Sequence, residues 1–521
     1  MMTTANSSMD GDGQALAATN GLKQSLGLYS ATALVVGSMI GSGIFIVDAD
    51  IARITGSPAL YLGAWVLTAF LTMVCALSYG ELAAMMPKAG GQYVYLRESL
   101  GKLWGFLYGW TVFLVIQTGT IAAVAMAFGK FLGVFFPAVS TTHWLWHIGH
   151  VPAIPVGPMV LGNMEIGVNT ANLTGIVVIC VLTFVNIFGV GLGALIQNIF
   201  TTAKALALAG LVGIALVLGR NATAWHANFG DHLSQFWRDA GWSTLHPVQV
   251  GVGGPTVWVN LLVVLAVVQV GSLFSADAWN NITFTAGEVK RPQRNLPLSL
   301  VLGTGFVLGV YFLVSLAYIL VLPLHGTPNG TTVLARGVQF AAEDRVATAV
   351  LEQIFHSGGA YAMAAAILIS TFGCVNGLTL AGARVYYAMS QDGLFFKAVG
   401  KLHPRYKTPV NGLIVQAVWA SLLCISGSYG QLLDYIIFAV LLFYILTIVG
   451  LFVLRIRRPD VPRPYKALGY PLLPALYIVT ASWICVVLLR YKPQYTWPGL
   501  VIVLLGVPVY FFWSIRVNRA A

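Results

Sequence analysis

Two short stretches of glycine and polar residues interrupt apolar segments of this chain, and their backbone groups are the first candidates for ligand chemistry. The first is Gly37-Ser-Met-Ile-Gly-Ser-Gly-Ile-Phe45, inside the apolar segment 29–47. Each glycine costs a helix about 1 kcal/mol relative to alanine, so this spacing predicts a break. Amides and carbonyls freed by a break can hold a polar ligand. Alternatively, Gly37 and Gly41 form a small-residue face for packing against another helix.

The second stretch is Gly271–Asn281, inside the apolar segment 257–286. It carries an aspartate, two asparagines and two serines, which are costly in an apolar helix and therefore need a reason. The Asp277 carboxylate has two interpretations. It selects a cationic group of a ligand, or it caps the helix that resumes after the break.

Composition defines the elements that must position these stretches. The chain has 521 residues, of which 58% are hydrophobic and 9% charged, whereas soluble domains carry about 25% charged residues. This indicates a polytopic membrane protein. The pattern predicts twelve spans, all helical because no alternating barrel pattern occurs: 29–47, 58–86, 103–136, 168–190, 194–219, 257–286, 297–322, 360–389, 409–427, 432–455, 471–489 and 497–515. Residues 1–28 are polar and predicted to form a disordered cytoplasmic tail.

The distribution of charge orients these spans. Most of the 28 Lys and Arg residues fall in the segments that are inside when the N-terminus is cytoplasmic, as the positive-inside rule requires. We therefore expect both termini in the cytoplasm of a cell (plasma or inner) membrane. The net charge of +11 then reflects topology and gives no indication of nucleic-acid binding.

Metal and disulfide chemistry find little support. The five cysteines all lie in apolar segments without metal-site spacing, so neither a metal site nor a disulfide is expected. The expected outer loop 137–167 holds His143, His147 and His150, which would share a face of a helix and could bind zinc. The neighbouring tryptophans favour an interfacial anchor instead.

The two interruptions occupy corresponding spans, the first and the sixth. If residues 29–219 and 257–455 are two halves of five helices each, the breaks match. Matching interrupted segments in two halves are the best sequence indication of a transporter binding site. An odd number of helices gives the halves opposite orientations, with helices 11 and 12 (471–515) added outside the repeat.

Several motifs resemble one family in its own order. Residues 37–45 resemble the first-helix signature of the amino acid–polyamine–organocation transporters. Residues 81–95 resemble their inner loop between helices two and three, 274–280 with 287–297 their sixth helix and its exit, and 384–393 the end of their eighth. Within the family, the L-type amino-acid transporters and their bacterial relatives are most similar. The resemblance implies an inverted five-plus-five fold with helices 1 and 6 broken, and amino-acid transport.

The resemblance also implies where a substrate binds. The substrate carboxylate would lie on the amides of Gly41, Ser42 and Gly43, where the N-terminal dipole of the outer half-helix favours an anion. Its ammonium would meet carbonyls near Met39 and Ile40 and, across the cavity, near Phe274, Ser275 and Asp277. This chain departs from the L-type pattern at Ala276 and Ala278, which places the pocket shape in question.

Phe274 has a second expected role, and Trp279 and Thr120 complete the expected site. Phe274 matches the family's outer-gate aromatic; a core or lipid-facing position is the alternative. Trp279 is assigned to the gate region, either as part of the gate or as packing that supports the break. Thr120 on the third helix is expected to line the pocket.

Lys204 lies deep in the fifth span, and it either snorkels to the interface or has a role in coupling. The resemblance places it where sodium-coupled relatives bind sodium. Its ammonium would replace the ion and bind carbonyls near Met39 and Ile40. Asn376 or Thr379 would be its partner on the eighth helix.

These features predict a secondary-active, sodium-independent amino-acid transporter, either an exchanger or a proton symporter. A polyamine or amine transporter of the same fold is the alternative, and a channel is less favoured because no filter of repeated carbonyls is evident. No enzyme motif or cofactor site is recognised. The expected partners are the substrate and the bilayer. The resemblance to L-type transporters implies a heavy-chain partner that is disulfide-linked through a cysteine in the outer loop between helices three and four. Loop 137–167 has no cysteine, so no such partner is expected.

Overall fold

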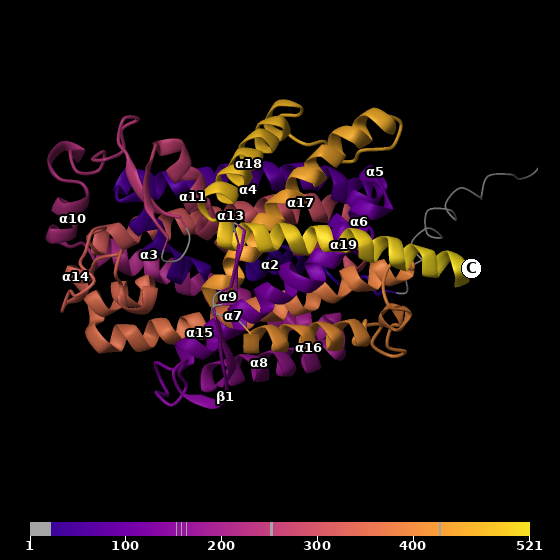
Figure 1. Ribbon diagram of the computed structural model, residues 1–521, viewed down its shortest axis with the longest axis horizontal. Helices are drawn as coiled ribbons and strands as arrows, with labels where there is room; N and C mark the ends of the chain where they lie inside the picture. The colour runs from indigo at the N-terminus through magenta and orange to yellow at the C-terminus, as the bar shows by residue number, and fades with distance from the viewer. Residues whose placement is uncertain are drawn as a thin grey trace, which may run out of the picture.

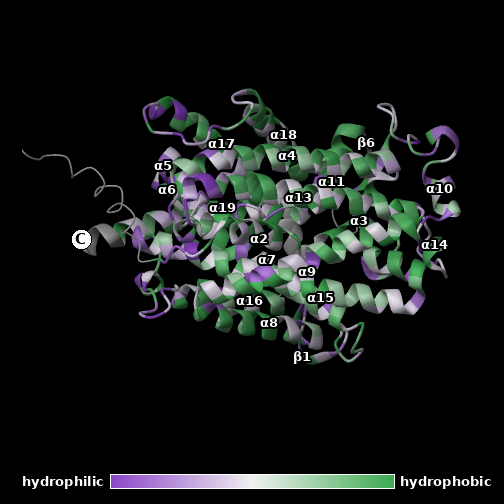
Figure 2. Cartoon of the chain, turned by 180° about the vertical axis from the view of Figure 1, so that it is seen from behind, coloured by the Kyte–Doolittle hydropathy of each residue, from purple (hydrophilic) through white to green (hydrophobic). Residues whose placement is uncertain are grey.

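The structure is a computed structural model that describes residues 22–152, 154–157, 159–162, 164–250, 254–426 and 429–520. Its helices lie side by side as a bundle along the long axis of the molecule (Figure 1). Apolar residues cover most of the helices, and hydrophilic residues gather toward the two ends of the bundle (Figure 2). This distribution is typical of helices that cross a membrane.

Helices occupy each of the twelve expected positions. The first five positions hold α2 (Leu28–Met39) with α3 (Gly43–Thr55), α4 (Pro58–Met85), α6 (Lys102–Thr111) continued by a π-helical turn (Val112–Ile116) into α7 (Gln117–Leu132), α8 (Thr170–Ile187) and α9 (Val190–Val217). The next five hold α11 (Leu261–Ser275) with α12 (Asn281–Phe284), α13 (Pro292–Val321), α15 (Val346–Gln391), α16 (Val410–Ser426) and α17 (Tyr429–Arg457). The last two are α18 (Leu472–Tyr491) and α19 (Pro493–Ala520).

Length and composition support most of these positions as membrane spans. Within the described part of the chain, nine helices are long and apolar enough to cross a membrane, and ten if the bent pair α2–α3 forms one span. The apolar helices α11 and Val410–Ile425 are shorter. The total of twelve spans and the inverted repeat therefore stay predictions.

The connections contain short elements as well as loops. The short helices are α5 (Gln92–Leu100), α10 (Ala222–Asn228) and α14 (Val333–Arg336), with single 3₁₀ turns at Asp231–Leu233, Ala286–Glu288, Ala342–Asp344 and Lys397–Gly400. Three antiparallel hairpins pair β1 (Trp144–Val151) with β4 (Met164–Asn169), β2 (Ile154–Val156) with β3 (Met159–Leu161), and β5 (His246–Gln249) with β6 (Thr256–Val259). The fold is thus mostly helical. The all-α prediction is wrong for two connections, α7 to α8 and α9 to α11, which contain these strands.

The tail predicted over residues 1–28 lies mainly outside the described residues, and its last part is ordered. The amides of Ser25 and Leu26 both donate to the Glu288 carbonyl at 2.9 Å, and Lys290 N donates to the Leu26 carbonyl at 2.8 Å. Leu26 is buried. The prediction of disorder is wrong for residues 22–28, because backbone hydrogen bonds and apolar burial offset the entropy of ordering them.

The first span continues beyond its expected end at residue 47. Helix α3 runs to Thr55, and Gly56 ends it in the left-handed conformation (φ 55°), as glycine often does after a helix. Asp48 lies just beyond the expected end, and its carboxylate is fully buried. It accepts hydrogen bonds from Tyr61, from Trp65 at 3.0 Å and from Ser315 at 3.0 Å. Neighbouring helices therefore supply the polar partners that water would supply in a loop.

Candidate functional site

The first break lies between α2 and α3, which are bent by 43° relative to each other. Ile40 and Ser42 are fully buried in it, and Gly41 N donates to the Met39 carbonyl at 2.9 Å. Helix α2 packs against α9, α13 and α15, and α3 packs against α11. The predicted interruption of the helix at residues 37–45 is therefore present in the structure.

The carbonyls freed by this break are bound by neighbouring helices. The Lys204 ammonium donates to the carbonyls of Gly37 at 2.6 Å and Ile40 at 2.8 Å. The Tyr311 hydroxyl donates to the Met39 carbonyl at 3.0 Å. Since buried carbonyls need partners, these contacts allow the helix to be interrupted inside an apolar bundle.

Lys204 lies on α9 and is 1% exposed, which excludes a snorkelling conformation in this structure. Its expected contact with Ile40 is present, but Gly37 replaces Met39, whose carbonyl is taken by Tyr311. Its eighth-helix contact is the Ser370 carbonyl at 3.3 Å. The Ser370 hydroxyl also donates to the Gly41 carbonyl at 3.0 Å. Helices α9 and α15 thus hold the break together.

Asn376 and Thr379 do not serve as partners of Lys204, which corrects that prediction. Asn376 donates to the Gly193 carbonyl at 3.1 Å and to Gln197 at 2.9 Å, and the Thr379 carbonyl accepts from Gln416 at 3.2 Å. Helical geometry explains the difference. Ser370 and Cys374 are four residues apart and share the face toward the first break, whereas residues 376 and 379 point away from it.

Gly41 and Gly43 lie where a side chain would collide with a neighbouring helix. A Cβ at Gly43 would be 2.3 Å from the Ser275 hydroxyl oxygen, and one at Gly41 would be 3.1 Å from the Cys374 sulfur. A Cβ at Gly37 would be 1.9 Å from the Gln197 amide nitrogen. The packing interpretation of the small residues is therefore correct for Gly37. In this conformation α11 closes over the Gly43 end of the expected carboxylate position, and α15 and α7 lie against Gly41.

The second break follows Ser275, where α11 ends, and α12 begins at Asn281. Ala278 adopts the left-handed conformation (φ 64°) between them. Asp277 N donates to the Phe274 carbonyl at 3.2 Å, and the Ser275 hydroxyl donates to the Gly271 carbonyl at 3.0 Å. The predicted break is therefore present here too, and part of its backbone is satisfied locally.

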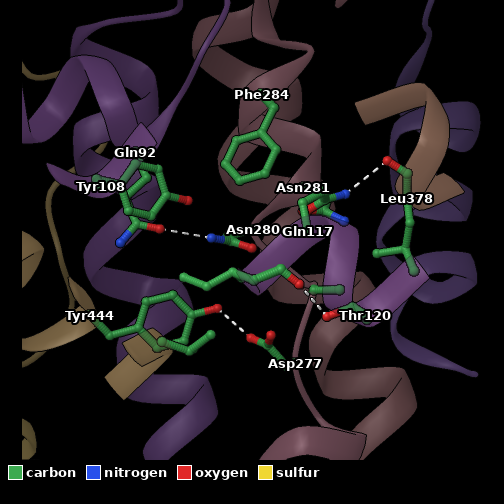
Figure 3. Close-up of a pocket in the computed structure, with 13 residues that line it drawn as sticks. Gln92, Tyr108, Gln117, Thr120, Asp277, Asn280, Asn281, Phe284, Leu378 and Tyr444 are labelled. Atoms are coloured by element: carbon green, nitrogen blue, oxygen red, sulfur yellow. Dashed lines mark hydrogen bonds between the residues drawn. The ribbon is translucent and has the colours of Figure 1, made fainter. Parts of the chain in front are cut away.

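A small polar cavity adjoins this second break (Figure 3). Its volume is about 20 Å³, enough for about one water molecule or a small polar group. The lining residues come from α5, α6, α7, the second break, α12, α15 and α17: Gln92, Tyr108, Ile116, Gln117, Thr120, Asp277, Ala278, Asn280, Asn281, Phe284, Leu378, Val440 and Tyr444. Thr120 and Asp277 are thus brought together as predicted, whereas Phe274 and Ser275 do not line this cavity.

Polar groups of opposite character meet in the cavity. Tyr444 donates to the Asp277 carboxylate at 2.5 Å, and Asn280 donates to Gln92 at 2.9 Å (Figure 3). Asn280, and not Asp277, occupies the N-cap position of α12, so the capping interpretation of Asp277 is not supported. The side-chain amide nitrogen of Asn281 (Nδ2) is buried and has no hydrogen-bond partner. A buried donor without a partner is costly and indicates a position for a ligand or water.

The cavity lies about one helical turn from the first break. A side chain at Gly41 would face Val124 on α7 and Cys374 on α15. The cavity is lined by Thr120 and Leu378 on the same two helices. Four residues correspond to about 6 Å along a helix. The two breaks and the cavity are therefore close enough for one small ligand to span them.

The two aromatic residues assigned to the gate are both buried. Trp279 stacks edge-on against Tyr79 at 4.8 Å between centroids and lies 5.3 Å from the Tyr444 ring. This packing supports the second break and favours the supporting role for Trp279. Phe274 is 7% exposed at the end of α11, which excludes a lipid-facing position and leaves its gating role a proposal.

Polar contacts join the elements at the predicted cytoplasmic end of the cavity. Arg384 on α15 makes a fully buried, bidentate ion pair with Glu288, with both N–O distances at 3.1 Å. Gly90 N donates to the Phe284 carbonyl at 3.0 Å. Because a buried charge is strongly destabilised when its partner is lost, this ion pair ties α15 to the 3₁₀ turn that follows α12.

Sequence reasoning missed Tyr444, Gln117 and Asn281 as cavity residues. Tyr444 stands in a mainly apolar stretch of helix, and Gln117 begins the short polar run Gln117–Thr120 inside one. Polar groups in such stretches are a usable signal. Asn281 follows the quoted motif directly. What the sequence lacked was the pairing of α17 with the second break.

The zinc interpretation places the three histidines on one face of a helix, and this geometry is wrong. His147 and His150 lie on strand β1, and both contact Glu165 on β4, at 2.7 and 3.0 Å. Hydrogen bonding to His147 holds the pKa of the Glu165 carboxyl below its ordinary value. His143 precedes the strand and contacts the Ala138 carbonyl at 3.2 Å instead. Within the described ranges, no group of three or more potential ligands could hold a metal ion.

Comparison with known proteins places this geometry in a family. The family model described as "Amino acid permease" matches residues 26–513. The chain is 30% identical to the human large neutral amino acids transporter small subunit 2, over 95% of this chain and 81% of that protein. It is 26% identical to the serine/threonine exchanger SteT of Bacillus subtilis, over 94% of this chain and 97% of that protein.

A further relative is the mouse b(0,+)-type amino acid transporter 1, at 26% identity over 96% of this chain and 91% of that protein. The family and these relatives are transporters rather than enzymes, and the many apolar helices indicate a multi-pass membrane protein. The broken helices and the near-complete matches lead to one conclusion: the chain belongs to the amino acid permease family of the amino acid–polyamine–organocation superfamily.

Proposed function

We propose that this amino acid permease is a sodium-independent, secondary-active transporter that works by alternating access around the two breaks. The observation that carries the proposal is the fully buried Lys204 ammonium on the carbonyls of Gly37 and Ile40. A sodium ion at this position would need the same oxygens. The lysine excludes it by volume and by like-charge repulsion, which is strong away from water.

The substrate carboxylate would bind the amides of Gly41, Ser42 and Gly43. These amides open α3, and the first turn of a helix presents unpaired N–H groups and a positive dipole end. Binding there requires α11 to move away from Gly43, since Ser275 closes the position in this structure. Closure of α11 over the substrate is the occlusion step of the proposed cycle, with Phe274 as its outer gate.

The substrate ammonium would lie toward the second break. The carbonyls of Met39 and Ile40 already accept from Tyr311 and Lys204, so they are weaker candidates than the sequence suggested. The acceptors on the other side are the carbonyls near Phe274 and Ser275 and the Asp277 carboxylate, which accepts from Tyr444 through one oxygen and lines the cavity. The side chain would then enter the cavity beside Thr120, which suits a small polar group. The names of the relatives, a neutral amino acids transporter and a serine/threonine exchanger, support neutral amino acids.

Lys204 also offers a means of coupling. Its carbonyl contacts belong to the broken first helix, and a buried ammonium is stable only while such contacts persist. If they open during the cycle, the proton can leave and transport is proton-linked. If they persist in every state, the protein is an exchanger. The expected topology has both termini in the cytoplasm of a cell membrane, without a disulfide-linked heavy chain.

Transport by the purified protein in proteoliposomes tests this proposal. Uptake of radiolabelled serine, threonine, leucine and lysine would be measured in sodium and in choline buffer, with and without internal substrate and a pH gradient. We expect saturable uptake that is equal in both buffers. A strict sodium requirement overturns the role of Lys204, and an unsaturable conductance would indicate a channel.

A cationic amine is a second candidate substrate, favoured by one observation. Asp277 is the only charged side chain among the residues that line the cavity, and a cation would neutralise it. Competition by putrescine and cadaverine against amino-acid uptake separates the two candidates. Uptake by an amine carrier is inhibited at least as strongly by a diamine as by the amino acid that carries an additional carboxylate. Uptake by an amino-acid carrier requires the carboxylate and is not inhibited by the diamine.

A further inference from the structure

A groove on the outside of the helix bundle has the features of a ligand site and plays no part in the proposed transport. It lies between α4, the first turns of α13 and the segment 458–471 that links α17 to α18. Its volume is about 630 Å³, and its residues are Leu77, Gln293, Arg294, Pro297, Leu298, Val301, Pro464, Tyr465, Lys466 and Leu468. The walls are mainly apolar, and the two cations among them are Arg294 in the first turn of α13 and Lys466 in the connecting segment.

The apolar wall faces outward. Leu298 is 36% exposed and Leu468 is 67% exposed. Leu298 is on α13, where an exposed apolar side chain of a membrane-spanning helix meets lipid and not water, and Leu468 lies beside it in the connection to α18. The positive-inside distribution puts residues 290–294 and 455–466 on the cytoplasmic side. The groove therefore lies at the level where the headgroups and first acyl carbons of the inner leaflet are found.

Arg294 and Lys466 have no carboxylate within ion-pair distance among the residues that the structure describes, and both are exposed. Their neighbours behave differently. Arg455 and Arg463 both pair with the buried Glu81, at 2.6 and 3.2 Å. Two free cations beside two paired ones indicate that the free pair is available to an external anion.

The wall formed by the segment 458–471 is held in place. The Ala467 amide donates to Glu81 at 2.7 Å, and Arg455 stacks over the Tyr470 ring at 3.7 Å. The Tyr465 ring lies directly against Gly80 of α4, since a Cβ there would be 2.9 Å from it. The Tyr465 hydroxyl is buried and has no hydrogen-bond partner. The groove is therefore formed before any ligand arrives, which lowers the cost of binding.

We propose that this groove binds an anionic phospholipid of the inner leaflet, with its phosphate on Arg294 and Lys466 and an acyl chain along Leu298 and Val301. Basic pockets between membrane helices on the cytoplasmic side are recognised sites for anionic headgroups. The apolar wall adds a requirement for an attached chain, because a free phosphate ion would leave that surface uncovered.

Native mass spectrometry of the full chain, released from nanodiscs of phosphatidylglycerol or phosphatidylcholine, tests the proposal. We expect one retained phosphatidylglycerol, and binding weaker by about tenfold or more in the double variant Arg294→Gln/Lys466→Gln. The control is Lys290→Gln/Arg457→Gln, which removes two exposed cations from the same face outside the groove. Equal losses in both double variants, or equal retention of the two lipids, overturn the site.

Two further measurements identify the source of the anion and test the site without removing its charges. Inorganic phosphate at millimolar concentration is expected not to displace the lipid, and displacement would assign the cations to a soluble anion. The variant Val301→Trp keeps both charges and fills the groove, so it should also lose the lipid. Retention of phosphatidylglycerol by a folded Val301→Trp protein contradicts the placement of the acyl chain.

Discussion

The two breaks arise from similar sequence and are stabilised in opposite ways. At the first break, the protein itself binds the freed carbonyls, through Lys204 and Tyr311. At the second break, a carboxylate faces a cavity and one amide donor has no partner. The comparison teaches that an interruption in an apolar helix does not by itself mark a binding surface. What matters is which freed or polar groups the neighbouring helices leave unsatisfied.

The largest effect is expected at Lys204. Lys204→Ala removes the ammonium from the Gly37 carbonyl and leaves the Ile40 carbonyl with only the Ser370 hydroxyl, at 3.2 Å. An unsatisfied buried group costs about 1–3 kcal/mol. We predict that transport falls to background and that the melting temperature falls as well, measured by uptake and by thermal unfolding. The control is Lys130→Ala at the end of α7, where the side chain is partly exposed. Full uptake by Lys204→Ala would mean that the first break needs no cation.

Gly43→Leu is expected to follow closely, because its side chain would enter the space of Ser275 on α11. The substitution should block closure over the substrate and reduce transport by at least about tenfold, whereas Gly43→Ala should have a smaller effect. Replacing Ser275 with glycine in the Gly43→Ala background should restore part of the activity. Gly63→Ala is the control, since no atom lies within 4 Å of a Cβ there.

If neither the rescue nor the loss is found, the first break does not close against α11. Substrate binding at equilibrium, measured by scintillation proximity on folded protein, separates lost binding from lost closure. Normal binding by folded Gly43→Leu would contradict the carboxylate position on residues 41–43.

At the second break the effect should fall mainly on binding. Asp277→Ala removes the carboxylate proposed to accept from the substrate ammonium, and loss of a hydrogen bond to a charged group is worth about 1.5–3 kcal/mol. We predict substrate affinity weaker by about 10- to 150-fold, with a smaller fall in melting temperature because the Tyr444 hydroxyl loses its acceptor. Tyr444→Phe should give a smaller loss of the same kind. A drop in stability without a change in affinity would make Asp277 a structural residue.

Phe274→Leu should have the smallest effect of these variants. It shortens the side chain at the end of α11 while conserving most of the buried volume, so folding should persist. We expect transport to fall a few-fold and equilibrium binding to change less, because the gate closes over a substrate held mainly by backbone groups. Phe306→Leu, on the exposed face of α13, is the control. Identical transport rates for Phe274→Leu and the wild type would remove Phe274 from the gate.

Several features of the fold follow directly from residue type. Glycine and serine cost a helix free energy wherever it lies, so the breaks near residues 41 and 277 could be predicted from composition alone. Long apolar segments likewise identify the helices, because a backbone in lipid must satisfy its own hydrogen bonds. The family resemblance also directed attention to Lys204 and to its contact with Ile40.

The tertiary structure decided which groups meet. The choice of Ser370 over Asn376, of Gly37 over Met39, and the pairing of Tyr444 with Asp277 depend on the rotation and depth of α9, α15 and α17 relative to the breaks. The burial of Asp48 likewise depends on donors from α4 and α13. A sequence records the polar character of each residue, but whether a polar group is satisfied depends on distances of about 3 Å between helices. Those distances are set by packing across the whole bundle, and no local pattern of residues encodes them.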